Sequence, residues 1–276
     1  MSRPFPLRLL PGLVLLAATP LPAADSPPAS SPWDQAALGL FKDAHASFAQ
    51  QAAAADREAR FGEAVTLINL QPKTDTNLDR AASLLTAIAA TDATDELGVS
   101  SRYYLARIAQ IHRASPDNAA ALRIYRELAG LSSPHALAQR AVVHVALLEL
   151  FDPRLAPAEI RPGFDRLAAR GATLTDPSAL RDFHLVMGDA ALRFNLGETI
   201  ALDHLLAADR AGIVRATTQR DTWVRIAELA RRTGRNDVAI TYYRHFLDKF
   251  LRDSRRLMIT ERLAALTATQ PAEAAR

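Results

Sequence analysis

Three acidic residues, Asp92, Asp95 and Glu96, form the most compact group of potential ligands in the sequence. Their spacing resembles the cation-binding carboxylates of a helical lyase or of a calcium site. A calcium loop also needs alternating oxygen ligands and a glycine at fixed spacing, which Ala93 and Thr94 do not provide. Acidic residues directly before a helix cap its first turn and interact favourably with its dipole. The pattern therefore favours a helix start over a cation site.

The histidines lie too far apart for a metal-binding pair on one helix, which needs two ligands about three to five residues apart. They are His45, His112, His135, His144, His184, His204 and His245. Three of them, His144, His184 and His204, occupy repeat positions that elsewhere hold leucine, tryptophan or tyrosine. A ring with an apolar body and a polar edge suits such a half-buried position. We therefore interpret these histidines as packing residues and expect neither a metal nor a cofactor.

Other catalytic motifs are missing from the sequence. The chain has no cysteine, which excludes disulfides, thiolate zinc sites, thiol nucleophiles and a lipidated cysteine. None of the lysines, Lys42, Lys73 and Lys249, follows the glycine-rich turn of a phosphate-binding loop. The segment from Gly98 to Arg102 lacks the closing glycine of a serine-hydrolase elbow. We therefore expect a protein that is not an enzyme.

Residues 1–24 have the three parts of a secretory signal. Arg3 and Arg8 are followed by an apolar stretch from Leu9 to Ala18 and by a small-residue end at Ala24. The apolar stretch is shorter than the roughly 20 residues that span a bilayer. We expect a periplasmic or secreted protein with no stable membrane insertion after cleavage of the signal. Export also argues against a nucleic-acid partner.

The rest of the chain is predicted to be helical and repetitive. Alanine is abundant, glycine is sparse at 11 residues, and alternating runs of valine, isoleucine and threonine are missing, which favours helix over sheet. One apolar position recurs about every 40 residues; a large side chain follows it four positions later, and further apolar residues follow seven and eight positions later. The recurring residues are Ala81, Ala121, Ile160, Ile200 and Ala239. These offsets define one face of an α-helix.

A second recurring set lies 16 residues before the first in every repeat. Its members are Val65, Leu105, His144, His184 and Trp223, and most are followed by a large and then a small residue on the same helical face. Turn-forming segments such as Ser115 to Asn118 separate the two sets. Each repeat is therefore predicted to be a helical hairpin, and the register extends outward to Phe41 and to Leu263 as capping helices.

The last repeat carries a family resemblance. Its residues Trp223, Ile226, Ala227, Gly234, Ala239, Tyr243 and Phe246 have the spacing of the tetratricopeptide-repeat signature. The repeat that contains Leu105, Ala109, Ala121, Tyr125 and Leu128 is similar to it. The resemblance to this family, including envelope proteins of bacteria, implies an all-α fold: a right-handed α-solenoid of about five hairpins and about twelve helices. The usual unit has 34 residues, so each unit here must contain longer helices or loops.

We expect four segments along the chain. Residues 1–24 are the signal peptide, 25–32 a proline- and serine-rich tether, 33–267 the repeat domain and 268–276 a flexible tail. The tether and the tail have compositions that do not support a packed core.

The resemblance implies a scaffold or adaptor that binds a protein or peptide in a groove lined by the first helix of each hairpin. In the two best repeats the expected groove residues are Tyr103, Ala106, Gln110, Arg113, Asp221, Val224, Glu228 and Arg231, with Arg232 beside them. The basic clamp that some members use for a peptide's terminal carboxylate is not evident.

Two other functions remain open. One is an enzyme, or enzyme accessory, that acts on cell-wall glycan with two carboxylates from different repeats. Candidate carboxylates are Glu149, Asp182, Asp189 and Glu228. The other is a structural or oligomerising element, for which an exposed apolar face on an end helix would be the distinguishing feature.

Charge changes sign along the chain. Residues 25–100 contain five basic and eleven acidic side chains, residues 101–209 twelve of each, and residues 210–262 thirteen basic and six acidic. This polarity is typical of solvated helix faces, or of two ends that bind different surfaces. In the second case the C-terminal third would hold an acidic partner through Arg231, Arg232, Arg255 and Arg256.

Overall fold

A computed structural model describes residues 31–52, 56–131 and 134–269. Within these residues the chain forms helices and no strand, which confirms the all-α prediction. The helices are α1 (Pro32–Ala37), α2 (Phe41–Ala52), α3 (Arg57–Asn69), α4 (Asp75–Thr91), α5 (Glu96–Arg107), the π-helix η1 (Ile108–His112), α6 (Asn118–Ala129), α7 (Ala136–Leu150), α8 (Pro157–Gly171), α9 (Pro177–Arg193), α10 (Glu198–Arg210), α11 (Ala216–Arg232), α12 (Asn236–Lys249) and α13 (Arg256–Thr269).

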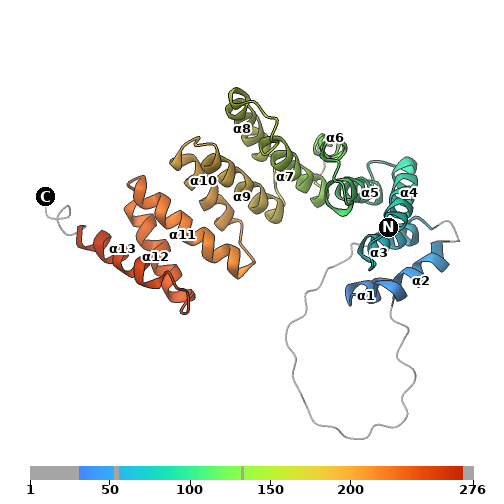
Figure 1. Ribbon diagram of the computed structural model, residues 1–276, viewed down its shortest axis with the longest axis horizontal. Helices are drawn as coiled ribbons and strands as arrows, with labels where there is room; N and C mark the ends of the chain where they lie inside the picture. Colours follow the sequence, from blue (N-terminus) through green and yellow to red (C-terminus); the bar gives the residue numbers. More distant parts are fainter. Residues whose placement is uncertain (1–30, 53–55, 132–133, 270–276) are drawn as a thin grey trace, which may run out of the picture.

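The helices pack mainly against their neighbours in sequence and form one elongated solenoid, with α1 and α2 at one end and α13 at the other (Figure 1). Five hairpins follow one another: α3 with α4, α5 and η1 with α6, α7 with α8, α9 with α10, and α11 with α12. Helices α2 and α13 flank them. The prediction of a tetratricopeptide-like helical solenoid with capping helices is therefore confirmed.

The recurring apolar positions form the contacts between helices. Ala81, Ala121 and Ala239 are fully buried, and the large side chains four positions after them, Leu85, Tyr125 and Tyr243, are fully buried as well. Small residues at these positions let the second helix of each hairpin approach its neighbours closely. One core cluster runs from the second hairpin to α13, and a separate cluster fills the first hairpin.

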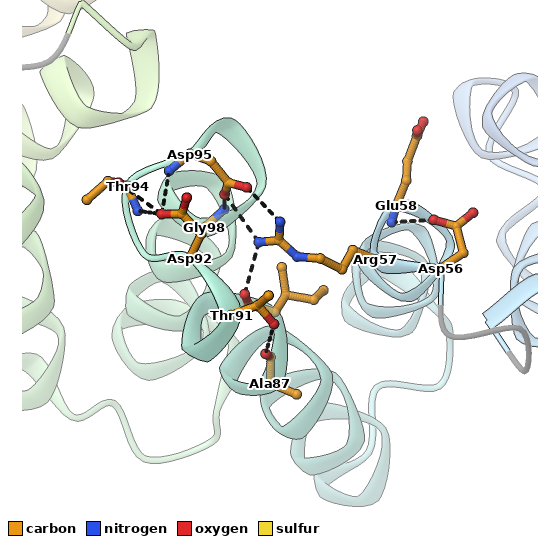
Figure 2. A network of polar contacts seen from close by, with 10 residues as sticks. Asp56, Arg57, Glu58, Ala87, Thr91, Asp92, Thr94, Asp95 and Gly98 are labelled. Atoms are coloured by element: carbon orange, nitrogen blue, oxygen red, sulfur yellow. Dashed lines mark hydrogen bonds and ion pairs between the residues drawn. The ribbon is translucent and has the colours of Figure 1, made fainter.

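The acidic cluster begins α5, as the spacing predicts. The Asp95 carboxylate accepts a hydrogen bond from the Gly98 backbone N–H at 2.7 Å, and Asp92 accepts from the backbone N–H of Thr94 at 2.8 Å (Figure 2). Asp95 also pairs with Arg57 of α3 at 2.6 Å. These hydrogen bonds and the Arg57 guanidinium lower the pKa of both carboxyl groups. The cluster therefore fastens one hairpin to the next, and Gly98 is required because a Cβ would lie 1.9 Å from the Asp92 carbonyl oxygen.

The second repeat contains a helical irregularity that the spacing does not reveal. Helix α5 continues into the π-helix η1, in which each backbone hydrogen bond spans one more residue than in an α-helix. Residues after Ile108 are therefore rotated about the helix axis relative to an unbroken α-helix. Within η1 the Gln110 side-chain oxygen accepts hydrogen bonds from Tyr125 at 3.0 Å and from Arg107 at 3.1 Å.

The third hairpin departs most from regular stacking. Helix α7 packs closely on both α6 and α9, whereas α8 makes few contacts with α7 and α9 and projects from the stack (Figure 1). Its C-terminal end is seated by Gly171, where a Cβ would lie 2.0 Å from the Phe183 ring of α9. Only a glycine lets that ring close against the α8 backbone. Helix α8 is thus held at one end and stands away from α6 along its length.

The first and last described helices extend slightly beyond the expected limits of the repeat domain. Ser31 caps α1 and Pro32 is its first residue, so the last two residues assigned to the tether belong to the helical domain. Helix α13 continues to Thr269, two residues beyond the predicted end of the domain. The predicted signal peptide, the rest of the tether and residues 270–276 of the predicted tail lie outside the described residues.

Candidate functional site

The groove residues predicted in the second repeat do not line an open surface. Tyr103 is 6% exposed, Gln110 is 8% exposed and Ala106 is fully buried, because α6 and α7 cover this face of α5 and η1. Arg113 lies at the surface, where its guanidinium pairs with Asp79 of α4 at 2.6 Å. Both Tyr103 and Gln110 are packed in the core of this structure, and their contact with a partner stays a prediction.

Tyr103 instead belongs to a buried aromatic cluster. Its hydroxyl forms a hydrogen bond with Nε2 of His144 at 2.9 Å, and the His144 ring stacks on Tyr125 with centroids 4.6 Å apart. Burial lowers the pKa of His144 to about 4 and raises the pKa of Tyr103. A second contact of this kind joins α9 and α10, where Nδ1 of His184 and Nδ1 of His204 are 2.9 Å apart. The interpretation of these histidines as packing residues is confirmed.

We expect these rings to make the protein less stable in mild acid. Burial lowers the pKa of His144 and of His204 to about 4, from an ordinary value of 6.5. The unfolded chain therefore takes up protons between about pH 6.5 and pH 4 that the folded chain does not, so the free energy of unfolding falls as the pH falls through this window. We expect a loss of about 1–2 kcal/mol for each ring, because both are partly solvated.

Urea unfolding at a series of pH values measures this effect. The variant His204→Gln should lose less stability between pH 6.5 and pH 4 than the unaltered chain. Carboxylates such as Asp92 and Asp95, whose pKa values are lowered, contribute their loss mainly below about pH 4. An equal loss in both proteins across the upper window would contradict the role given to His204.

The groove residues predicted in the last repeat lie at or near the surface, but the charged ones form ion pairs with other residues of the chain. Glu228 accepts a hydrogen bond from the Tyr243 hydroxyl at 2.5 Å and pairs with Arg262 and, at 3.3 Å, with Arg231. Asp221 pairs with Arg255 at 2.9 Å. Val224 is half-buried. The Arg262 and Arg231 guanidiniums and the Tyr243 hydroxyl outweigh the effect of partial burial and lower the pKa of Glu228.

The four arginines expected to hold an acidic partner are engaged as well. Arg231 pairs with Glu228, and Arg232 pairs with Glu198 of α10 at 3.0 Å. Arg255 pairs with Asp253 and Asp221, and Arg256 donates to the backbone carbonyls of Leu247 and Phe250. An acidic partner at these arginines would compete with ion pairs and hydrogen bonds that connect helices. The excess of basic residues in the C-terminal third therefore overstates how many arginines there are free to bind a partner.

The carboxylates considered for glycan hydrolysis each have a basic partner. Glu149 pairs with Arg126 and Arg166, Asp182 with Arg181 at 2.8 Å, and Asp189 with Arg225 at 2.5 Å. Glu228 has the partners given above. In the part of the chain that the structure describes, none of these four carboxylates lies beside another of the four, as a pair for glycoside hydrolysis would require. Among the described residues, no group of three or more histidine or acidic side chains could hold a metal ion.

Two recesses of the described surface lie between α8 and α6. One cavity of about 510 Å³ lies near the start of α8 and another of about 580 Å³ lies near its end, and α7 forms the floor of both. We call this feature the α6–α8 groove. Its apolar lining includes Leu122 of α6, Ala138, Val142 and Leu150 of α7, and Ala158 and Pro162 of α8.

Charged side chains bridge the groove. The Glu149 carboxylate accepts hydrogen bonds from Arg126 of α6 at 2.8 Å and from Arg166 of α8 at 2.9 Å, one on each oxygen. Nearer the end of α8, Arg170 donates to the Ala129 carbonyl. Two guanidiniums thus share the Glu149 carboxylate, and the third binds a backbone carbonyl. Such guanidiniums keep N–H donors that can bind a further carboxylate.

Another ion pair lines the recess near the start of α8. Arg154 binds Asp152 through both oxygens and holds the pKa of that carboxyl group at about 2. Glu159 lines the same recess, and the Arg126 and Arg166 side chains are 57% and 68% exposed. The groove therefore consists of two open recesses with an apolar floor and charged side chains at the surface.

Sequence reasoning missed this groove. Helical periodicity identifies which face of α8 is apolar, but not how far α8 stands from α6. One signal in the sequence is Pro162, which lacks a backbone N–H inside the helix. It points to the third repeat as irregular.

No protein-family model matches the chain, and no curated protein shows a significant match. Among solved structures, the chain is similar to a thermophilic tetratricopeptide-repeat protein from Thermus thermophilus. The sequence identity is 15%, the similarity covers 77% of this chain and 100% of that chain, and the TM-score is 0.41. At this level of similarity the fold assignment rests on the helices and the packing described above.

Proposed function

We propose that this chain is a protein-interaction scaffold and that the α6–α8 groove is its main binding site. The observation that carries the proposal is the loose packing of α8, which makes few contacts with α7 and α9 and leaves two recesses between itself and α6. Recesses with a hydrophobic floor and charged walls suit a segment of another protein, which can place alternate side chains in them.

We propose as occupant a peptide or helix that presents apolar side chains next to a carboxylate. Val142, Leu150 and the neighbouring apolar residues would receive the apolar side chains. The guanidiniums of Arg166 and Arg170 would receive the carboxylate. This assignment keeps the acidic partner but moves it from the C-terminal arginines to the third hairpin, where the arginines lie beside an apolar recess.

An enzymatic role is the second candidate. The ion pairs formed by the candidate carboxylates, Glu149, Asp182, Asp189 and Glu228, argue against it. The secretory character of residues 1–24 supports a place of action in the bacterial envelope or outside the cell. Among the described helices, none is both long enough and apolar enough to cross a membrane.

Filling the groove should abolish binding without harming the fold. Gly163 lines the groove, and a Cβ built on it would make only ordinary contacts, 3.9 Å from Arg166 and 4.0 Å from Leu150. In Gly163→Leu the new side chain extends into the 510 Å³ cavity. For peptides selected from a displayed library with the full chain, we expect the affinity to fall at least about tenfold, which corresponds to about 1.4 kcal/mol.

The matched control is Thr241→Leu, which adds a leucine to an exposed position of α12, outside the groove. It should leave peptide affinity unchanged, and both variants should unfold at or above the temperature of the unaltered chain. Peptides that bind Gly163→Leu as well as the unaltered chain would overturn the groove as the binding site.

A further inference from the structure

The two ends of the solenoid have features that the proposed function does not use. Of the seven large hydrophobic side chains that are exposed in the described residues, four lie at the ends. Leu38 and Leu40, in the loop between α1 and α2, are 74% and 48% exposed. Leu251 and Leu257, before and within α13, are 69% and 73% exposed. Isolated exposed leucines are common, but a pair at each end of a solenoid is a potential contact surface.

The outer face of α13 extends the apolar surface at the C-terminal end. Ile259 is buried, and Met258 and Leu263 are partly buried against the core. Leu257, Ala264 and Ala268 lie on the opposite side of the helix and are exposed, with Glu261 as the charged residue between them. A terminal repeat normally presents a polar outer face that keeps the solenoid soluble. This helix instead offers a mostly small and apolar face.

The ends also differ in charge. Residues 31–52 contain two acidic side chains and one basic one, whereas residues 244–262 contain six basic and three acidic ones. Beside the N-terminal leucines, Asp34 and Asp43 have no basic partner in the described part of the chain, although Lys42 lies between them in sequence. At the other end, Arg244 and Arg252 are exposed and have no carboxylate partner among the described residues. The same ends of two copies should therefore repel each other, and the N-terminal end of one copy should attract the C-terminal end of another.

We propose that the chain associates head to tail with further copies of itself, the α1–α2 end of one copy docking on the α13 end of the next. Leu38 and Leu40 of one copy lie against Leu251, Leu257 and the alanines of α13 in the other. Asp34 and Asp43 then face Arg252. Because the two surfaces differ, the contact is heterologous, and repetition produces an open chain of copies rather than a closed dimer.

Two glutamate variants, each altered at one end, test this arrangement. Leu38→Glu with Leu40→Glu alters the first end, and Leu251→Glu with Leu257→Glu alters the second. The exposed Val214, which is 84% exposed in the loop between α10 and α11, provides the control Val214→Glu. All these side chains are well exposed, so we expect unchanged helicity and unfolding temperature.

Sedimentation velocity of the full chain should show association that weakens at least about tenfold when salt rises from low to roughly 0.5 M, because screening removes the attraction between unlike ends. Each end variant alone should be monomeric, and Val214→Glu should associate like the unaltered chain. An equimolar mixture of the two end variants should form a one-to-one dimer, since each supplies the intact end that the other lacks. If the copies associated through residues 1–30 instead, both end variants would still associate, because neither variant alters that segment.

Three results would overturn the proposal. The first is a full chain that stays monomeric at its highest soluble concentration. The second is end variants that associate like the unaltered chain. The third is an equimolar mixture of the two end variants that stays monomeric although each variant alone has lost association. None of them affects the α6–α8 groove, because Gly163→Leu leaves both ends intact.

Discussion

Replacing Ala239 by arginine should unfold the C-terminal hairpin. Ala239 is fully buried in α12, at the position where this helix contacts α11 and α13. An arginine there must either enter the core without a carboxylate partner or push the helices apart. Overpacking and an unpaired buried charge together should cost at least about 4 kcal/mol. Since stability in a solenoid is largely local, we expect α11 to α13 to lose structure while α3 to α6 stay folded.

Hydrogen exchange followed by mass spectrometry measures this loss segment by segment. The control Thr241→Arg places the same side chain on the exposed face of α12 and should leave exchange unchanged. Slow exchange throughout α11 to α13 in Ala239→Arg would show that the repeat register is wrong at this position.

Removing the Phe183 ring should have the next largest effect. The ring is fully buried in α9 and lies against Gly171, where it seats the C-terminal end of α8. In Phe183→Ala the lost burial and the new cavity should reduce the free energy of unfolding by about 3–5 kcal/mol. Because α8 has few other contacts with α7 and α9, its amides should be the first to exchange faster.

Phe183→Leu provides the comparison, since it keeps most of the buried volume and should cost less than about 2 kcal/mol. Urea unfolding gives the two free energies, and hydrogen exchange gives the behaviour of α8. If α8 exchanged no faster in Phe183→Ala than the rest of the molecule, its attachment would not depend on this ring.

The fold could be predicted because it depends on local patterns. Offsets of four, seven and eight residues define a helix face, and the constant offset of 16 residues between the two sets fixes two helices per repeat. Ala121, Ala239 and their large neighbours are buried as that pattern requires. The acidic cluster at Asp92 and Asp95 was also predictable, since capping depends only on residues next to a helix start.

The binding surface could not be predicted in the same way, because it depends on distances between helices. The family pattern places Tyr103 and Gln110 in a groove, but η1 changes the helix geometry after Ile108, and the packing of α7 covers the remaining face. A prediction from periodicity assumes an unbroken α-helix, so it cannot detect a π-helix such as η1. Likewise, a charge count treats Arg232 and Arg255 as free, whereas the structure pairs both.

Site-specific photo-crosslinking tests the central claim, that the α6–α8 groove holds the partner, most directly. A photoreactive amino acid at Ala158, an exposed groove position of α8, should capture a selected peptide. The same amino acid at Thr241 of α12 should not, and adding Gly163→Leu should abolish capture at Ala158. Equal capture at both positions, or capture at Ala158 that persists in Gly163→Leu, would contradict the groove as the binding site of this scaffold.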